Sequence, residues 1–174
     1  MRTVGLVAII AAIALGASGE SAFAADKSGK SKPGKPGQSV DAKQIERGRY
    51  LAKIAGCNDC HTAGYAPSGG KVPEKDWLTG DMLGWRGPWG TTYPVNLRIY
   101  MQGISEDQWV KAAKSMRTRP PMPWFALNDM AVQDLRALYK FVRYLGPAGN
   151  PAPAGLRPDE TPKPPYVQFP APPK

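Results

Sequence analysis

The run Cys57-Asn58-Asp59-Cys60-His61 decides how the rest of the chain is interpreted. It contains both cysteines and the only histidine among the 174 residues. At the end of a helix, a separation of three residues would place the two sulfur atoms along one edge of a flat group. His61 comes next in the chain and would reach the same group from one of its faces. The run therefore predicts a site in which two thiols and one imidazole act together.

This spacing is the attachment signature of a c-type haem, in which each cysteine forms a thioether with a vinyl group and the histidine binds the iron. Three alternatives compete with it. A thioredoxin-like redox pair would need a strand–helix–strand context, a structural zinc site would need four ligands, and a disulfide across two residues would be strained. We therefore predict one covalent haem c, attached through Cys57 and Cys60, with His61 as an axial ligand of the iron.

A second axial ligand must come from another residue type, since a second histidine does not exist in this chain. Methionine ligation raises the reduction potential and suits electron transfer. Met122 is our preferred ligand, because Pro120, Pro121 and Pro123 fix the backbone around it and exclude a helix there. We expect Met116 to be a core residue of a helix. The other mature candidates are Met82, Met101 and Met130.

Three stretches have the periodicity of amphipathic helices: residues 42–55, a segment that opens at Ser105, and residues 132–145. Asp41 is placed to cap the first helix. The run Ser105-Glu106-Asp107-Gln108 has the form of a capping box at the start of the second. Gly146-Pro147 ends the third.

Strand signals are weak, so we predict an all-α domain with three main helices and long loops around one haem. The longest of these loops, residues 62–104, shows no clear periodicity. A structureless loop of that length is unusual, but it is tolerable where the loop wraps a large apolar group.

The first 24 residues read as a secretory signal peptide, with Arg2 at the start, an uncharged apolar stretch, and small residues at Ala22 and Ala24. The apolar run is too short for a membrane-spanning helix, which needs about 20 residues. We therefore expect a periplasmic protein with no stable membrane span after cleavage.

Composition divides the remaining chain into three parts. Residues 25–40 are rich in Lys, Gly, Ser and Pro and are expected to form a flexible linker. Residues 41–146 form one domain of ordinary size. Residues 147–174 contain ten prolines and are expected to be an extended, solvated tail, of which residues 150–174 should be removable. Its apolar residues Tyr166, Val167 and Phe169 would also suit packing on the domain or on a partner.

The chain has a formal net charge of +9, and residues 41–146 carry fifteen basic against ten acidic side chains. A basic surface favours acidic partners and speeds their encounter. We expect redox proteins with an acidic docking surface as partners. Nucleic acid is not expected, because the chain is exported and has no recognisable binding motif.

These features together resemble a class I cytochrome c over residues 43–147. Gly48-Arg49-Tyr50-Leu51-Ala52 ahead of the cysteines is similar to the family's first helix, Pro120-Pro121-Met122-Pro123-Trp124 to its distal methionine loop, and residues 135–142 to its last helix. The Asn-Leu pair in Tyr93-Pro94-Val95-Asn96-Leu97 resembles cytochrome c domains that accompany periplasmic dehydrogenases.

The resemblance implies the cytochrome c fold, with His/Met ligation and a crossing of the first and last helices at which Gly48 permits close approach. Ala131 stands where the family often has a serine cap, which leaves Asn128 or Asp129 to cap the last helix. In the family a proline carbonyl holds the proximal histidine, and Pro88 and Pro94 are both available here.

The function expected is electron transfer, either as a soluble carrier or as the cytochrome subunit of a redox enzyme complex. The chain itself is not expected to be an enzyme. The alternative is a catalytic or gas-sensing haem protein in which the sixth position of the iron is open.

Overall fold

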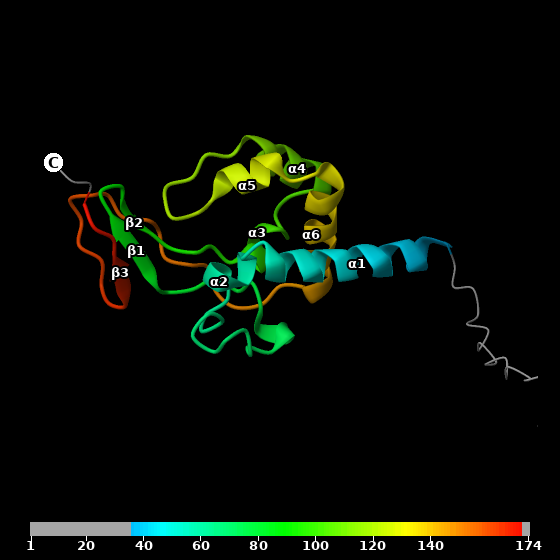
Figure 1. Ribbon diagram of the computed structural model, residues 1–174, viewed down its shortest axis with the longest axis horizontal. Helices are drawn as coiled ribbons and strands as arrows, with labels where there is room; N and C mark the ends of the chain where they lie inside the picture. The colour runs from blue at the N-terminus through cyan, green and yellow to red at the C-terminus, as the bar shows by residue number, and fades with distance from the viewer. Residues whose placement is uncertain (1–35, 172–174) are drawn as a thin grey trace, which may run out of the picture. The chain divides into compact units, whose positions relative to one another are not determined.

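The computed structural model describes residues 36–171, with side chains from residue 41 onward. Its helices are organised around the crossing of α1 (Pro36–Ile54) and α6 (Val132–Leu145), which make the most extensive contact between two described elements (Figure 1). A Cβ atom on Gly48 would lie 2.1 Å from the carbonyl oxygen of Ala137 and 2.6 Å from the Cβ atom of Phe141. The close approach expected at Gly48 is therefore confirmed.

The apolar core lies beside this crossing. Phe141 of α6 is fully buried and meets the ring of Trp77 edge to face, with ring centroids 6.2 Å apart. Trp109, on α4 (Glu106–Ser115), donates its indole N–H to the carbonyl oxygen of Leu135 at 2.8 Å. A buried indole N–H usually has a hydrogen-bond acceptor. Here the acceptor lies on α6, so the bond holds α4 against α6.

Two of the three expected helices agree with the structure where the sequence predicted their bounds: the second at its start and the third at both ends. The capping box at Ser105 is confirmed, since the side chains of Ser105 and Gln108 each bind the backbone N–H of the other. The helix at residues 132–145 is confirmed, and Gly146 follows it with a φ of 70°.

The expected caps of the other helix starts are wrong. Helix α1 begins at Pro36, so Asp41 lies within the helix and accepts a hydrogen bond from Lys140 instead of capping. Ala131 precedes α6 with no side-chain cap. Asn128 instead donates to the carbonyl oxygen of Ala113, near the end of α4.

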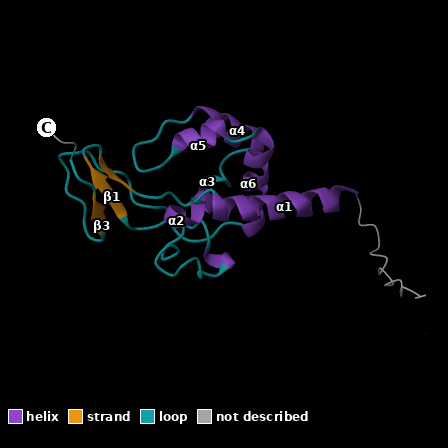
Figure 2. Cartoon of the chain, viewed as in Figure 1, coloured by secondary structure: helices purple, strands orange, loops and turns teal. Residues whose placement is uncertain are grey.

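The prediction of an all-α domain with three main helices is wrong. The described residues contain six α-helices and a mixed sheet of three strands, β1 (Gly84–Gly87), β2 (Gly90–Thr92) and β3 (Tyr166–Gln168), in the order β2-β1-β3 (Figure 2). β1 pairs antiparallel with β2 and parallel with β3. These strands are short and β1 and β2 are rich in glycine, so they leave no alternating pattern in the sequence.

Much of the expected long loop is ordered by short elements. Residues 62–104 contain the 3₁₀ helix η1 (Glu74–Asp76), strands β1 and β2, and helix α3 (Leu97–Tyr100). Asn96 caps α3 by accepting the backbone N–H of Ile99 at 3.0 Å. A further short helix, α5 (Trp124–Asp129), follows the proline-rich segment that carries Met122.

The C-terminal segment is part of the fold rather than a solvated tail. β3 completes the sheet, and Phe169 packs against the rings of Trp85 and Trp89, with centroids 6.0 and 5.3 Å away. In Figure 1 this segment, in orange and red, runs from α6 to the outer side of β1. The alternative that its apolar residues pack on the domain is the one observed.

The expected signal peptide, residues 1–24, lies outside the described residues, as do residues 25–35 of the expected linker. Residues 36–40 of that linker form the first turn of α1. Among the described residues no helix combines the length and the apolar character that a bilayer crossing requires.

Candidate functional site

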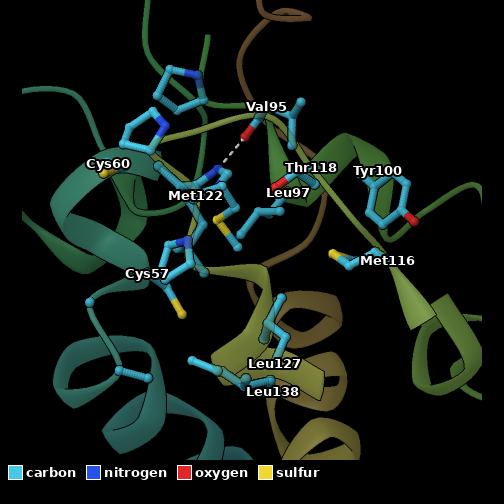
Figure 3. Close-up of a pocket in the computed structure, with 18 of the residues that line it drawn as sticks. Cys57, Cys60, Val95, Leu97, Tyr100, Met116, Thr118, Met122, Leu127 and Leu138 are labelled. Carbon is cyan, nitrogen blue, oxygen red and sulfur yellow. Dashed lines mark hydrogen bonds between the residues drawn. The ribbon is translucent and has the colours of Figure 1, made fainter. Parts of the chain in front are cut away.

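The Cys57–His61 run forms a short helix of its own, α2, directly after α1. Gly56 separates the two helices and adopts the left-handed conformation, with a φ of 71°, which glycine takes without a steric penalty. This turn places Cys57, Cys60 and His61 on the wall of one cavity (Figure 3).

The cavity has a volume of about 560 Å³, within the range of about 300–1,000 Å³ that is usual for ligand and cofactor sites. Its lining comes from α2, the β1–β2 region, α3, α4, the segment before α5, α5 itself and α6. Apolar side chains predominate, and no aspartate or glutamate contributes to the wall within the described part of the chain. The apolar residues include Leu78, Val95, Leu97, Trp109, Ala126, Leu127, Leu138 and Val142.

One nitrogen of His61 is already committed to the protein. Its Nδ1 atom lies 2.7 Å from the carbonyl oxygen of Val95. A carbonyl can only accept, so Nδ1 carries the proton and donates, which leaves the lone pair on Nε2. Burial lowers the pKa of His61, against the opposing effect of this hydrogen bond, and favours the neutral ring. A neutral imidazole with a free Nε2 is the form that binds a metal.

The acceptor is not a proline carbonyl, so the expected choice between Pro88 and Pro94 is wrong. Val95, which follows Pro94 in the chain, is positioned by a close backbone contact at Gly80. The backbone N–H of Gly80 donates to the carbonyl oxygen of His61 at 2.8 Å, and a Cβ on Gly80 would lie 2.8 Å from the carbonyl oxygen of Pro94. The segments that follow His61 and precede α3 can therefore meet only at a glycine.

A buried polar cluster holds α2 in this position. Thr62 donates its hydroxyl to the side-chain oxygen of Asn58 at 2.8 Å and accepts the backbone N–H of Leu78 at 2.8 Å. Leu78 has a φ of 61°, which is rare for a residue other than glycine, and it lines the cavity. Its carbonyl oxygen accepts the backbone N–H of Leu97 at 3.0 Å, so the strained residue joins α2 to α3.

The two cysteines are free thiols in a low-dielectric setting. Burial raises the pKa of Cys57 to about 11 and also raises that of Cys60. Redox-active and zinc-binding cysteines require thiolates, which a lowered pKa provides. The motif also has helix α1, not a strand, before it. Both observations weigh against a thioredoxin-like pair.

The five candidate methionines do not behave alike. Met82 is 62% exposed and lies away from the cavity. The other four line it: Met101, Met116, Met122 and Met130. Met116, expected to be an ordinary core residue, is half-buried at the end of α4, and Figure 3 shows it with Met122 at the same cavity as Cys57. The cavity lining thus removes Met82 from the candidates and retains Met122.

Three wall residues, Val95, Trp85 and Arg119, were not predicted from the sequence. The indole N–H of Trp85 is buried and finds no acceptor among the described residues. The glycine content of residues 84–93 was the available signal, because Gly often marks a site where a ligand or another backbone approaches closely. A bound group with acceptor atoms would satisfy this donor.

The residues present fit a haem attached in the c-type manner. Two thiols and a neutral imidazole with a free Nε2 stand at one wall, thioethers are available on others, and the remaining lining is apolar. Within the described residues, no group of three or more His, Cys, Asp or Glu side chains could hold a metal ion by itself. The site therefore lacks the ligands for a bare ion, whereas a haem brings four nitrogens of its own.

Comparison with known proteins found no match: no family model, no curated protein and no solved structure is similar to this chain.

Proposed function

We propose that this chain is a c-type cytochrome that carries one covalent haem and passes single electrons between redox proteins in the periplasm. The observation that carries the proposal is the meeting of Cys57, Cys60 and His61 at one wall of an apolar cavity, with Nδ1 of His61 bound to Val95. Three side chains from five consecutive positions thus present the donor set of the attachment motif to a space of suitable size.

Each side chain has a distinct role in this proposal. Cys57 and Cys60 hold the haem through thioether bonds, His61 binds the iron through Nε2, and Met122 supplies the second axial ligand. The bound haem supplies an iron that changes between two oxidation states. Val95 fixes the tautomer and the orientation of the His61 ring, as outer-shell partners of metal-binding histidines generally do.

The walls of the cavity support a carrier over a catalyst. Among the described residues, His61 is the only imidazole, and no carboxylate contributes to the lining. General acid–base catalysis near the iron would most often use such a group within hydrogen-bond reach. The proline-rich segment around Met122 limits movement at the proposed ligand. For these reasons we favour electron transfer over catalysis or gas sensing at an open sixth position.

Features of the sequence support the compartment and the partners in this proposal. The signal-peptide features of residues 1–24 support export, and the basic charge supports partners with an acidic docking surface. The chain would act as a soluble carrier or as the cytochrome subunit of an oxidoreductase complex, with no enzymatic activity of its own.

Visible spectra of the exported protein, oxidised and reduced, test the proposal. We expect the bands of a six-coordinate c-type haem, with a methionine-to-iron charge-transfer band at the red edge of the oxidised spectrum, and no binding of carbon monoxide to the reduced form. Carbon monoxide binding by the unaltered protein would favour the open-position alternative. A protein purified from cells competent in haem attachment without any haem absorption would refute both.

A further inference from the structure

The C-terminal segment and the β1–β2 hairpin form one structural unit, which we call the sheet platform and define as residues 84–92 and 155–169. β3 pairs with β1, and the backbone N–H of Phe169 donates to the carbonyl oxygen of Arg86 at 2.8 Å. The Phe169 ring packs against those of Trp85 and Trp89. Backbone pairing and ring packing together hold the two parts of the platform to each other.

A second junction within the platform joins Thr91 to Leu156. Their backbones exchange two hydrogen bonds, of 3.0 and 2.9 Å. The approach requires a glycine at position 90, where a Cβ would lie 2.2 Å from the carbonyl oxygen of Leu156. The C-terminal segment therefore reaches the edge of β2 at Leu156, next to the segment that carries Met122.

That segment, residues 117–123 between α4 and α5, has little hydrogen bonding of its own. Within the described part of the chain, the backbone of residues 117–123 forms no helix or strand and only one turn, at Pro120 and Pro121. Three of the residues are prolines, which have no N–H. Its position must therefore come from contacts with its surroundings.

The contacts with the platform are made by two neighbouring residues. Pro120 accepts the hydroxyl of Thr92 at 2.8 Å. The guanidinium of Arg119 donates to three carbonyl oxygens, those of Leu156 at 2.7 Å, Trp89 at 3.1 Å and Thr91 at 3.4 Å. One side chain thus joins the Met122 segment to both parts of the platform, three positions before Met122 itself.

We propose that Arg119 is a positioning residue, which fastens the Met122 segment to the sheet platform and so sets how Met122 stands in the cavity. This inference rests on the proposed function and deepens it. A thioether is a weak donor, so its bond to iron depends on how well the protein holds it in place. The C-terminal segment, distant in sequence, then contributes to ligation by providing the Leu156 acceptor.

Two substitutions in the full-length, haem-loaded protein test this role. Arg119→Ala removes the guanidinium. Gly155→Ala keeps it but displaces it, because the new Cβ would lie 2.1 Å from a terminal nitrogen of Arg119. Arg157→Ala is the matched control, since its side chain is 74% exposed and, among the described residues, forms ion pairs only with Asp159 and Glu160 of the same turn.

We expect both test variants to keep the haem, to lose intensity in the methionine-to-iron band, and to bind carbon monoxide at least about tenfold more readily when reduced, because each hydrogen bond from a charged group contributes about this factor. The Arg157→Ala protein should match the unaltered one. If both test variants retain the band and exclude carbon monoxide, Arg119 has no positioning role, although the proposed function stands.

Trypsin cleavage after Arg117 provides a readout that does not depend on haem. We expect about tenfold faster cleavage in Arg119→Ala than in the unaltered protein, because cleavage follows the population of the open segment. Equal rates would overturn the inference. If none of the proteins contains haem, the proposed function fails, and the cleavage rates still decide whether Arg119 holds the segment.

Discussion

The Nδ1 atom of His61 and the carbonyl oxygen of Val95 lie 2.7 Å apart, although 34 positions separate the two residues in the chain. The bond depends on Gly80, which lets the backbone after α2 pass close to the backbone before α3. Val95, which has no polar side chain, thus determines through its carbonyl oxygen which nitrogen of His61 keeps a free lone pair.

Gly80→Ala should loosen this bond. The new Cβ would lie within 2.9 Å of two backbone atoms, and the residue would have to hold a φ of 80°. We expect the free energy of unfolding to fall by about 1–3 kcal/mol, and the reduction potential to rise, since the hydrogen bond makes the ligand more basic. Denaturant unfolding and potentiometry measure the two effects.

Gly103→Ala is the control for this substitution, because only one atom, 3.6 Å away, lies near its Cβ position and its φ is ordinary. It should leave both quantities nearly unchanged. A Gly80→Ala protein with the stability and potential of the unaltered chain would show that the Val95 bond does not depend on the glycine.

Replacing methionines one at a time should separate the proposed ligand from its neighbours. Met122→Ala should abolish the charge-transfer band, lower the potential and admit carbon monoxide, because the iron loses a donor that favours the reduced state. Met101→Ala, Met116→Ala and Met130→Ala also alter the cavity wall but should lower only stability. The band assigns the ligand directly: if it persists in Met122→Ala and disappears in another variant, that other methionine binds the iron.

Elements with local signals could be predicted from the sequence. The helix at residues 132–145 has a regular apolar face and a glycine after it, and Ser105 and Gln108 form a box within four positions. The sheet could not be predicted, because strands of three or four residues show no period and β3 lies about 80 positions from β1. Likewise Cys57, Cys60 and His61 are close together in sequence, whereas Val95 and Arg119 act through backbone contacts that no residue pattern specifies.

The ion pair between Arg47 and Asp134 should make stability depend on pH. The Arg47 guanidinium, which binds both oxygens of Asp134, holds the pKa of that carboxyl below its ordinary value. A pKa lower in the folded than in the unfolded chain stabilises the fold above about pH 4, and this contribution is lost as the pH falls further. Asp134→Asn should therefore lower the free energy of unfolding at neutral pH by less than about 1 kcal/mol.

Urea titrations over a pH series check this expectation. The difference between Asp134→Asn and the unaltered chain should shrink below about pH 4. A difference that grows toward acid pH would mean that the ion pair does not lower the pKa of Asp134 in the folded chain.

The exposed basic residues near the Met122 segment, Lys111, Lys114 and Arg117, should speed reaction with anions. We expect oxidation of the reduced protein by ferricyanide to slow as salt rises, because screening acts over about 8 Å at physiological ionic strength. Exchanging Lys111 and Lys114 for glutamate should weaken that dependence, and a cationic oxidant should show the reverse trend. A rate independent of salt for both oxidants would argue against electrostatic steering.

Acid–acetone extraction of the exported protein tests the covalent attachment of haem most directly. We predict that the haem stays with the polypeptide, because thioether bonds to Cys57 and Cys60 survive denaturation. In a protein with both cysteines replaced by alanine, any haem taken up should pass into the solvent. Release of the haem from the unaltered protein would contradict the central claim that this chain is a c-type cytochrome.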